Sequence, residues 1–189
     1  MVDMTNYGAK DLAAAFRTVR NNTIKIAEEI GEEHYSLRAT PDTRSVAETL
    51  IHVAHLPEMA QELHGVQKAT TVMEFDFMGF MMPRITDEKT KRPKADILKM
   101  LADGRDQFAN WLEGVSDDFL SQPVSMPPGA QPPSKSRFEM LLGVKEHEMH
   151  HRGQLMVLER MLGMVPHLTR QMEAMRARML SQQASTAKS

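Results

Sequence analysis

Apolar residues recur every three or four positions along five segments of this chain, and this spacing is the strongest constraint on its fold. The segments cover residues 9–30, 46–65, 94–115 and 137–162, followed by a shorter stretch after Pro166. A period of 3.6 residues places the apolar side chains on one face of a helix, whereas a half-buried strand requires alternation. No segment alternates convincingly, so the sequence predicts an all-α protein.

Capping and helix-breaking residues mark where these helices begin and end. Ser45 with Glu48, and Ser136 with Glu139, form capping boxes at the starts of the second and fourth long segments. Gly163 follows the fourth. The prolines between positions 123 and 133 predict a stiff, non-helical loop before it. Four long helices around one core indicate a four-helix bundle.

Residues 69–93 fit two structures. The apolar and aromatic stretch 71–82 suits either a short helix that ends at Pro83 or a loop that covers a pocket. The charged stretch 87–94 is predicted to be exposed.

The length of 189 residues indicates one domain, or one domain with an appendage. We expect the bundle to occupy residues 1–166, with a C-terminal helix and a disordered tail in residues 167–189. Leu168, Met172, Met175 and Met179 fall on one face of that helix, and the tail is expected to begin at Ser181. The other face of the helix is basic, with Arg170, Arg176 and Arg178.

The composition excludes several classes of function. A net charge of −2 argues against nucleic acid or an anionic membrane surface as the main partner. No apolar run is long enough to span a membrane, and the first five residues lack the features of a signal peptide, so we expect a cytoplasmic protein. The absence of cysteine rules out disulfides, thiolate ligands and a cysteine nucleophile.

A pair of histidines in the fourth helix is the main functional feature. His147 and His151 are four residues apart and leave the helix on the same face, about 40° apart, together with Gln154. That face is the apolar one, and two unpartnered imidazoles buried there would be costly. Either the pair binds a metal or it forms hydrogen bonds inside the core, and the spacing favours a metal.

A third ligand is sought on the second helix. His52 lies at the border of its apolar face, whereas His55 is predicted to be solvated and His64 to lie on the surface at the helix end. Three histidines from two helices would leave a coordination position open for water or substrate. Glu48 and Gln154 are candidates to orient an imidazole or the bound ligand.

These residues resemble the DinB/YfiT-like superfamily of metal-binding helical bundles. The resemblance rests on the order of elements from about residue 9 to 165, on the segment 45–52 that ends in His52, and on the segment 147–155, where His147 and His151 are followed by Arg152, Gly153 and Gln154. It implies an up-down-down-up four-helix bundle, often a homodimer, with nickel, zinc or a similar divalent ion on His52, His147 and His151. Iron and manganese also suit a cysteine-free site.

The resemblance further implies a reaction on a small molecule. Some members of the superfamily are thiol-dependent transferases or isomerases that use mycothiol, bacillithiol or glutathione, so a metal-dependent thiol S-transferase or hydrolase is expected. The alternative is a non-catalytic metal- or small-molecule-binding scaffold whose C-terminal helix docks on a partner or a second protomer. No specific catalytic residue is assigned.

A remote alternative is a zinc metalloprotease, because residues 147–151 also spell H-E-x-x-H. That interpretation makes Glu148 the general base. Two observations argue against it. The sequence predicts no strand of the kind that binds the peptide in such enzymes, and Glu148 points about 100° away from the face of His147.

Overall fold

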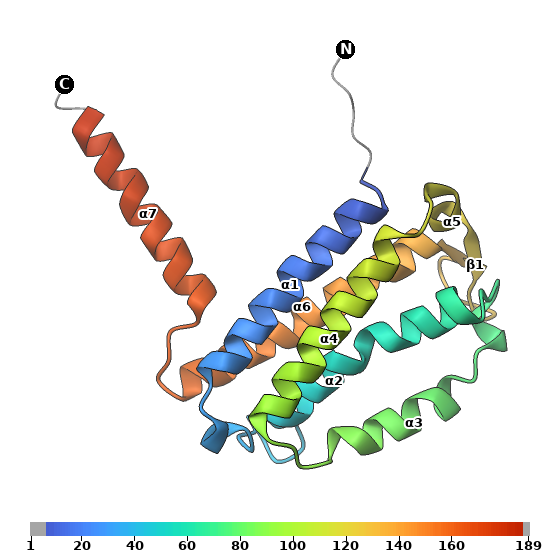
Figure 1. The fold of residues 1–189 in the computed structure, drawn as a ribbon, viewed down its shortest axis with the longest axis horizontal. Coiled ribbons are helices and arrows are strands. Elements are labelled where there is room, and N and C mark those ends of the chain that lie inside the picture. Colours follow the sequence, from blue (N-terminus) through green and yellow to red (C-terminus); the bar gives the residue numbers. More distant parts are fainter. Residues whose placement is uncertain (1–6, 187–189) are drawn as a thin grey trace.

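The computed structural model describes residues 7–186, and four long helices form its body (Figure 1). These are α1 (Ala9–Glu29), α2 (Val46–Ala60), α4 (Lys94–Glu113) and α6 (Arg137–Met161). The four-helix bundle predicted from the apolar periodicity is confirmed. The features expected of the first five residues, and of the tail beyond residue 186, lie outside the described residues.

The four helices follow an up-down-down-up course. α1 packs against α4 and α6, and α2 packs against the same two helices, so α1 and α2 occupy opposite corners of the bundle. Figure 1 shows α2 and α4 running in the same direction, with α1 and α6 running against them. Two consecutive parallel helices require a connection that returns along the bundle.

Residues 61–93 provide this connection. α2 passes into a π-helical turn, η2 (Gln61–Val66), which is followed by a short 3-10 helix, η3 (Val72–Glu74), and by α3 (Phe77–Glu88). α3 lies along α2 on the outside of the bundle. Pro83 was predicted to end any helix here, but it lies inside α3. The prediction that residues 87–94 are exposed is wrong for Glu88, which is buried because its carboxylate faces α2.

The other connections contain short elements of their own. A 3-10 helix, η1 (Glu32–His34), follows α1, and α5 (Asp117–Ser121) follows α4. The proline-rich loop contains two strands that the sequence did not predict, β1 (Pro123–Ser125) and β2 (Ser134–Ser136). They pair antiparallel with Pro123 opposite Ser136, which closes the loop at the start of α6.

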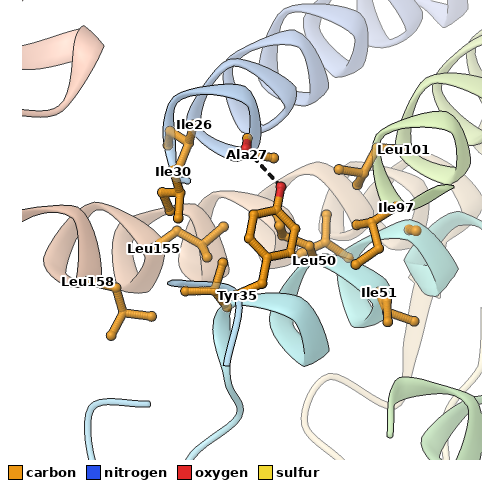
Figure 2. Close-up of a cluster of buried hydrophobic side chains, with 13 residues drawn as sticks. Ile26, Ala27, Ile30, Tyr35, Leu50, Ile51, Ile97, Leu101, Leu155 and Leu158 are labelled. Carbon is orange, nitrogen blue, oxygen red and sulfur yellow. Dashed lines mark hydrogen bonds between the residues drawn. The ribbon is translucent and has the colours of Figure 1, made fainter. Parts of the chain in front are cut away.

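Apolar side chains from all four helices fill one end of the bundle. Figure 2 shows Ile26, Leu50, Ile97 and Leu155 meeting there, with the Tyr35 hydroxyl donating to the carbonyl oxygen of Ala27 at 2.8 Å. A second apolar cluster fills the other end of the bundle: Leu12, Phe16, Phe108, Leu112 and Leu141 belong to it. Burial of these two clusters supplies the main stabilisation of the fold.

A buried ion pair lies between the two clusters. Arg20 of α1 and Glu148 of α6 are both fully buried, and the Arg20 Nε donates to the two carboxylate oxygens at 2.9 and 3.0 Å. The remaining Arg20 nitrogens donate to the carbonyl oxygens of Leu101 in α4 and Val53 in α2. One side chain therefore contacts each of the other three helices.

The C-terminal helix α7 (His167–Thr186) stands away from the bundle (Figure 1). Its first residue, His167, is buried, but residues 170–186 are exposed. The helix includes residues 181–186, which were expected to belong to a disordered tail. Within residues 7–186, no helix combines the length and the apolar character needed to cross a membrane.

We predict that the ion pair controls the stability of the bundle. Glu148→Ala should lower the free energy of unfolding by about 3–5 kcal/mol, because it leaves the Arg20 charge buried and unpaired. The double variant Arg20→Met/Glu148→Leu should recover part of this loss, because it leaves no buried charge. Urea denaturation measures both.

The matched control is Lys99→Ala, which removes an exposed ion pair with Asp103 on α4 and should cost less than about 0.5 kcal/mol. If Glu148→Ala lowered the free energy of unfolding by no more than Lys99→Ala does, the buried pair would not be what holds the bundle together.

Candidate metal centre

Three histidines from two helices converge beside the buried ion pair. His52 comes from α2, whereas His147 and His151 come from successive turns of α6. One ring nitrogen of each lies within 4.8 Å of those of the other two. His52 and His151 are buried and His147 is exposed, so the group opens to solvent on one side. The structure thus brings together all three residues that the sequence nominated as ligands.

Hydrogen bonds hold two of these rings by the nitrogen that faces away from the group. The Nδ1 of His52 lies 2.7 Å from Oε1 of Glu88, and the Nδ1 of His151 lies 2.9 Å from Oε1 of Gln154. Both acceptors are oxygens, so each Nδ1 bears the proton when the ring is neutral. The Nε2 lone pairs of His52 and His151 are therefore directed at the centre of the group.

The Nε2 of His52 is the atom of the group that most needs a partner. It is buried and has no hydrogen-bond partner among the residues that the structure describes. The other two rings contact each other through their Nε2 atoms, at 3.0 Å. A buried nitrogen lone pair without a partner is costly, and a metal ion would satisfy it. The three nitrogen donors fit a divalent transition metal.

The charge state of the rings suits a metal as well. Burial lowers the pKa of His151 to about 4 and also lowers the pKa of His147. Both imidazoles are therefore neutral at pH 7, which is the form that binds metals.

Glu88 and Arg44 belong to the site although the sequence analysis did not find them. Glu88 holds His52 through Oε1 and accepts from the Arg44 Nε through Oε2 at 2.7 Å. Burial alone would raise the pKa of Glu88, but the hydrogen bonds from His52 and Arg44 outweigh it and lower that pKa. A carboxylate behind a histidine ligand is a common arrangement that orients the ring. Glu88 lies 36 residues from His52 in the chain, so no helical periodicity connects the two.

The two residues nominated to orient the site have different roles. Gln154 accepts from His151 and lies 3.1 Å from the Nε2 of His150, so it links two rings of α6. Glu48 forms no hydrogen bond or ion pair with His52, His147 or His151. It completes the capping box with Ser45 and pairs with Arg38.

Two predictions about the remaining histidines of this region are wrong. His55 was expected to be solvated, but it is largely buried between Glu58 and Asp87, at 2.7 and 2.9 Å. His64 was expected at the surface, but it is buried because the guanidinium of Arg137 donates to its Nδ1 at 2.9 Å. Each histidine is satisfied by a partner distant in the sequence.

The position of Glu148 bears on the protease interpretation. Its side chain is fully buried and both oxygens bond to Arg20. A general base must reach the water or substrate that it deprotonates. Glu148 is enclosed in the core instead, so it is not available for that role.

A cavity of about 1060 Å³ is lined by His151 of the group and by the neighbouring His150. Its walls come from α6, from α2, from the end of α3 and from the loop that precedes α2. His151 and Gln154 line it on one side and Glu88 on another, and Ile85, Val157 and Leu158 add apolar surface. The volume is at the upper end of the range for small-molecule sites.

Comparisons with known proteins agree with this description. YfiT from Bacillus subtilis, described as a probable metal-dependent hydrolase with an unusual four-helix bundle topology, matches 87% of this chain and 93% of its own, with 13% identity and a TM-score of 0.64. A DinB-like protein from the same organism, YjoA, matches 80% of this chain and 91% of its own, with 19% identity and a TM-score of 0.58. These likenesses concern the fold. No curated protein matches the sequence.

The sequence itself matches a family model over residues 15–155, a range that includes α2, α6 and the three histidines. The chain belongs to the DinB superfamily.

Proposed function

We propose that His52, His147 and His151 hold a divalent metal, nickel or zinc in the first place, and that the protein is a metal-dependent enzyme acting on a small molecule. The observation that supports this most directly is the buried, unpartnered Nε2 of His52, which faces the other two imidazoles. Iron and manganese can also bind histidine nitrogens, and they are the second choice for this site.

The chemistry follows from the number of ligands. A divalent metal held by three histidines keeps a position free and lowers the pKa of a bound water or thiol. The exposed side of His147 gives solvent access to that position, and the adjoining cavity accommodates the substrate. Glu88 and Gln154 hold the imidazoles in place, and His150 lines the cavity beside them.

The reaction belongs to one of two classes. Hydrolysis is supported by the description of YfiT as a probable metal-dependent hydrolase. The second class is transfer of a group to a low-molecular-weight thiol. The thiol would have to be a co-substrate, because the chain has no cysteine that could serve as an internal acceptor. A homodimer is also part of the proposal.

We predict that the native protein binds one metal per chain. Chelator-treated protein should gain about 5–10 °C in melting temperature when the metal is restored at about 100 times its Kd, because the ligand binds only the folded state. His52→Ala and His151→Ala should abolish this gain. Metal analysis of native protein and differential scanning fluorimetry measure the two effects.

His34→Ala serves as the control, because His34 lies in η1 and is not part of the group of three. If the native protein contained no metal and showed no thermal shift with nickel or zinc, the proposal would fail. Turnover assays with esters, and with electrophiles plus bacillithiol or glutathione, then separate the two reaction classes.

We predict that Glu88 sets the affinity for the metal. Glu88→Gln should weaken metal binding by about 10- to 100-fold, because His52 loses the carboxylate that orients its ring. Competition with a chromophoric chelator measures the dissociation constant.

Glu58→Gln is the matched control, since Glu58 holds His55 at the same 2.7 Å distance but outside the group of three. Equal affinities for Glu88→Gln and the native protein would exclude this role.

We predict that burial of the histidines makes the metal-free protein sensitive to acid. The folded pKa of His151 is about 4, below the value near 6.5 of an unfolded chain. The folded state therefore binds fewer protons between these two values, and stability falls as the pH drops from about 6.5 towards 4. His151→Gln should flatten the dependence of melting temperature on pH in this range. An unchanged dependence would contradict the burial argument.

A further inference from the structure

The helix α7 presents an apolar face that no part of residues 7–186 covers. Met172, Met175 and Met179, here called the methionine face, lie on one side of the helix and are each at least half exposed. An isolated helix of this length is marginal in water, and a helix in a folded protein is stabilised mainly by packing of its apolar face.

The base of α7 is held at a defined position on the bundle. Arg170 pairs with Glu29 of α1 at 2.7 Å, and His167 lies 3.3 Å from Asn22 of the same helix. Arg160 of α6 donates to the Thr169 hydroxyl at 3.0 Å. The bundle thus fixes how α7 leaves it, and beyond this base the helix extends away from the body (Figure 1).

A second exposed apolar surface lies on the connection between α2 and α4. Met73, Phe77, Met78 and Met82, here called the α3 patch, are each about half exposed or more. Exposed apolar surfaces of this kind mark sites of association. Methionine packs favourably against aromatic rings and adapts to irregular surfaces, which suits contact between Phe77 and a methionine-rich helix.

The charges at the two surfaces are opposite. Arg176 and Arg178 flank the methionine face and form no ion pair with the residues that the structure describes. Glu74 and Asp76 flank the N-terminal end of the α3 patch, and they too lack an ionic partner within residues 7–186. Complementary charge of this kind sets the register of an interface and selects the partner.

The helices α7 and α3, which carry most of these residues, lie on opposite sides of the molecule (Figure 1). α7 leaves the bundle at the end where α6 terminates, whereas α3 lies along the far side of α2. The methionine face therefore does not reach the α3 patch of its own chain, and only another molecule places the two together.

We propose that the methionine face of α7 docks on the α3 patch of a second copy of this chain, with the two helices antiparallel. This orientation brings Arg178 towards Glu74 and Met172 towards Met82. It supplies an interface for the homodimer of the proposed function, and it rests on that part of the proposal alone. The contact lies on the helix that ends in Glu88, the residue that holds His52.

Sedimentation equilibrium of the full-length protein tests the interface. The native protein should have a mass above the 21.4 kDa of one chain. Met175→Glu and Met78→Glu should each weaken association by at least about tenfold, because either buries a charge in the same apolar contact. Ala177→Glu, on the opposite side of α7, should leave association unchanged.

A charge exchange tests the orientation. Arg178→Glu and Glu74→Arg should each weaken association, and the double variant should restore it. Metal content and helical circular dichroism are measured on every variant, so that loss of association is distinguished from loss of the metal centre or of the fold.

Three results would overturn the proposal. The native protein could remain at 21.4 kDa at every concentration. Met175→Glu could dissociate it while Met78→Glu does not, which would show that α7 pairs with α7. The double charge variant could fail to restore association, which would exclude the antiparallel alignment.

Discussion

The buried pair of Arg20 and Glu148 fixes how the four helices meet. Arg20 bonds to a carboxylate of α6 and to carbonyl oxygens of α2 and α4, so one guanidinium joins four helices in a single layer. A buried charge tolerates little displacement, because each lost hydrogen bond leaves a desolvated polar group. The pair therefore sets the rotation of α6 about its own axis. Apolar packing alone specifies that rotation less strictly.

The histidine group depends on this rotation. Glu148 follows His147 directly, and neighbouring residues of a helix point about 100° apart. With Glu148 held towards α1, His147 and His151 face α2 and meet His52. The residues of the H-E-x-x-H motif thus point to two different sides of α6. The histidines form the site and the glutamate stabilises the core, which is why the protease interpretation fails on geometry and not only on the absence of a peptide-binding strand.

The parts of this site that the sequence predicted are those that follow from local helix geometry. The spacing of His147 and His151 places them on one face wherever the helix lies. The apolar stripe located the buried face only approximately, because His147 is exposed whereas Glu148, predicted to point away from the core, is fully buried by its pairing with Arg20. Glu88 and His64 depend on contacts between distant segments. Glu88 reaches His52 only because residues 61–93 return along α2, and the buried His64 is satisfied by Arg137 of α6. No periodicity encodes either contact.

The two exposed apolar surfaces raise the question of how association relates to the metal centre. α3 carries the α3 patch on its outer side and Glu88 at its last turn, and Glu88 contacts both His52 and Arg44. A helix that packs on one side only is among the more mobile parts of a fold. A partner that covers the α3 patch would restrict α3 and with it the carboxylate behind His52. Under the two proposals, association and metal affinity would be linked, and by thermodynamic reciprocity a bound metal would strengthen the interface to the same extent.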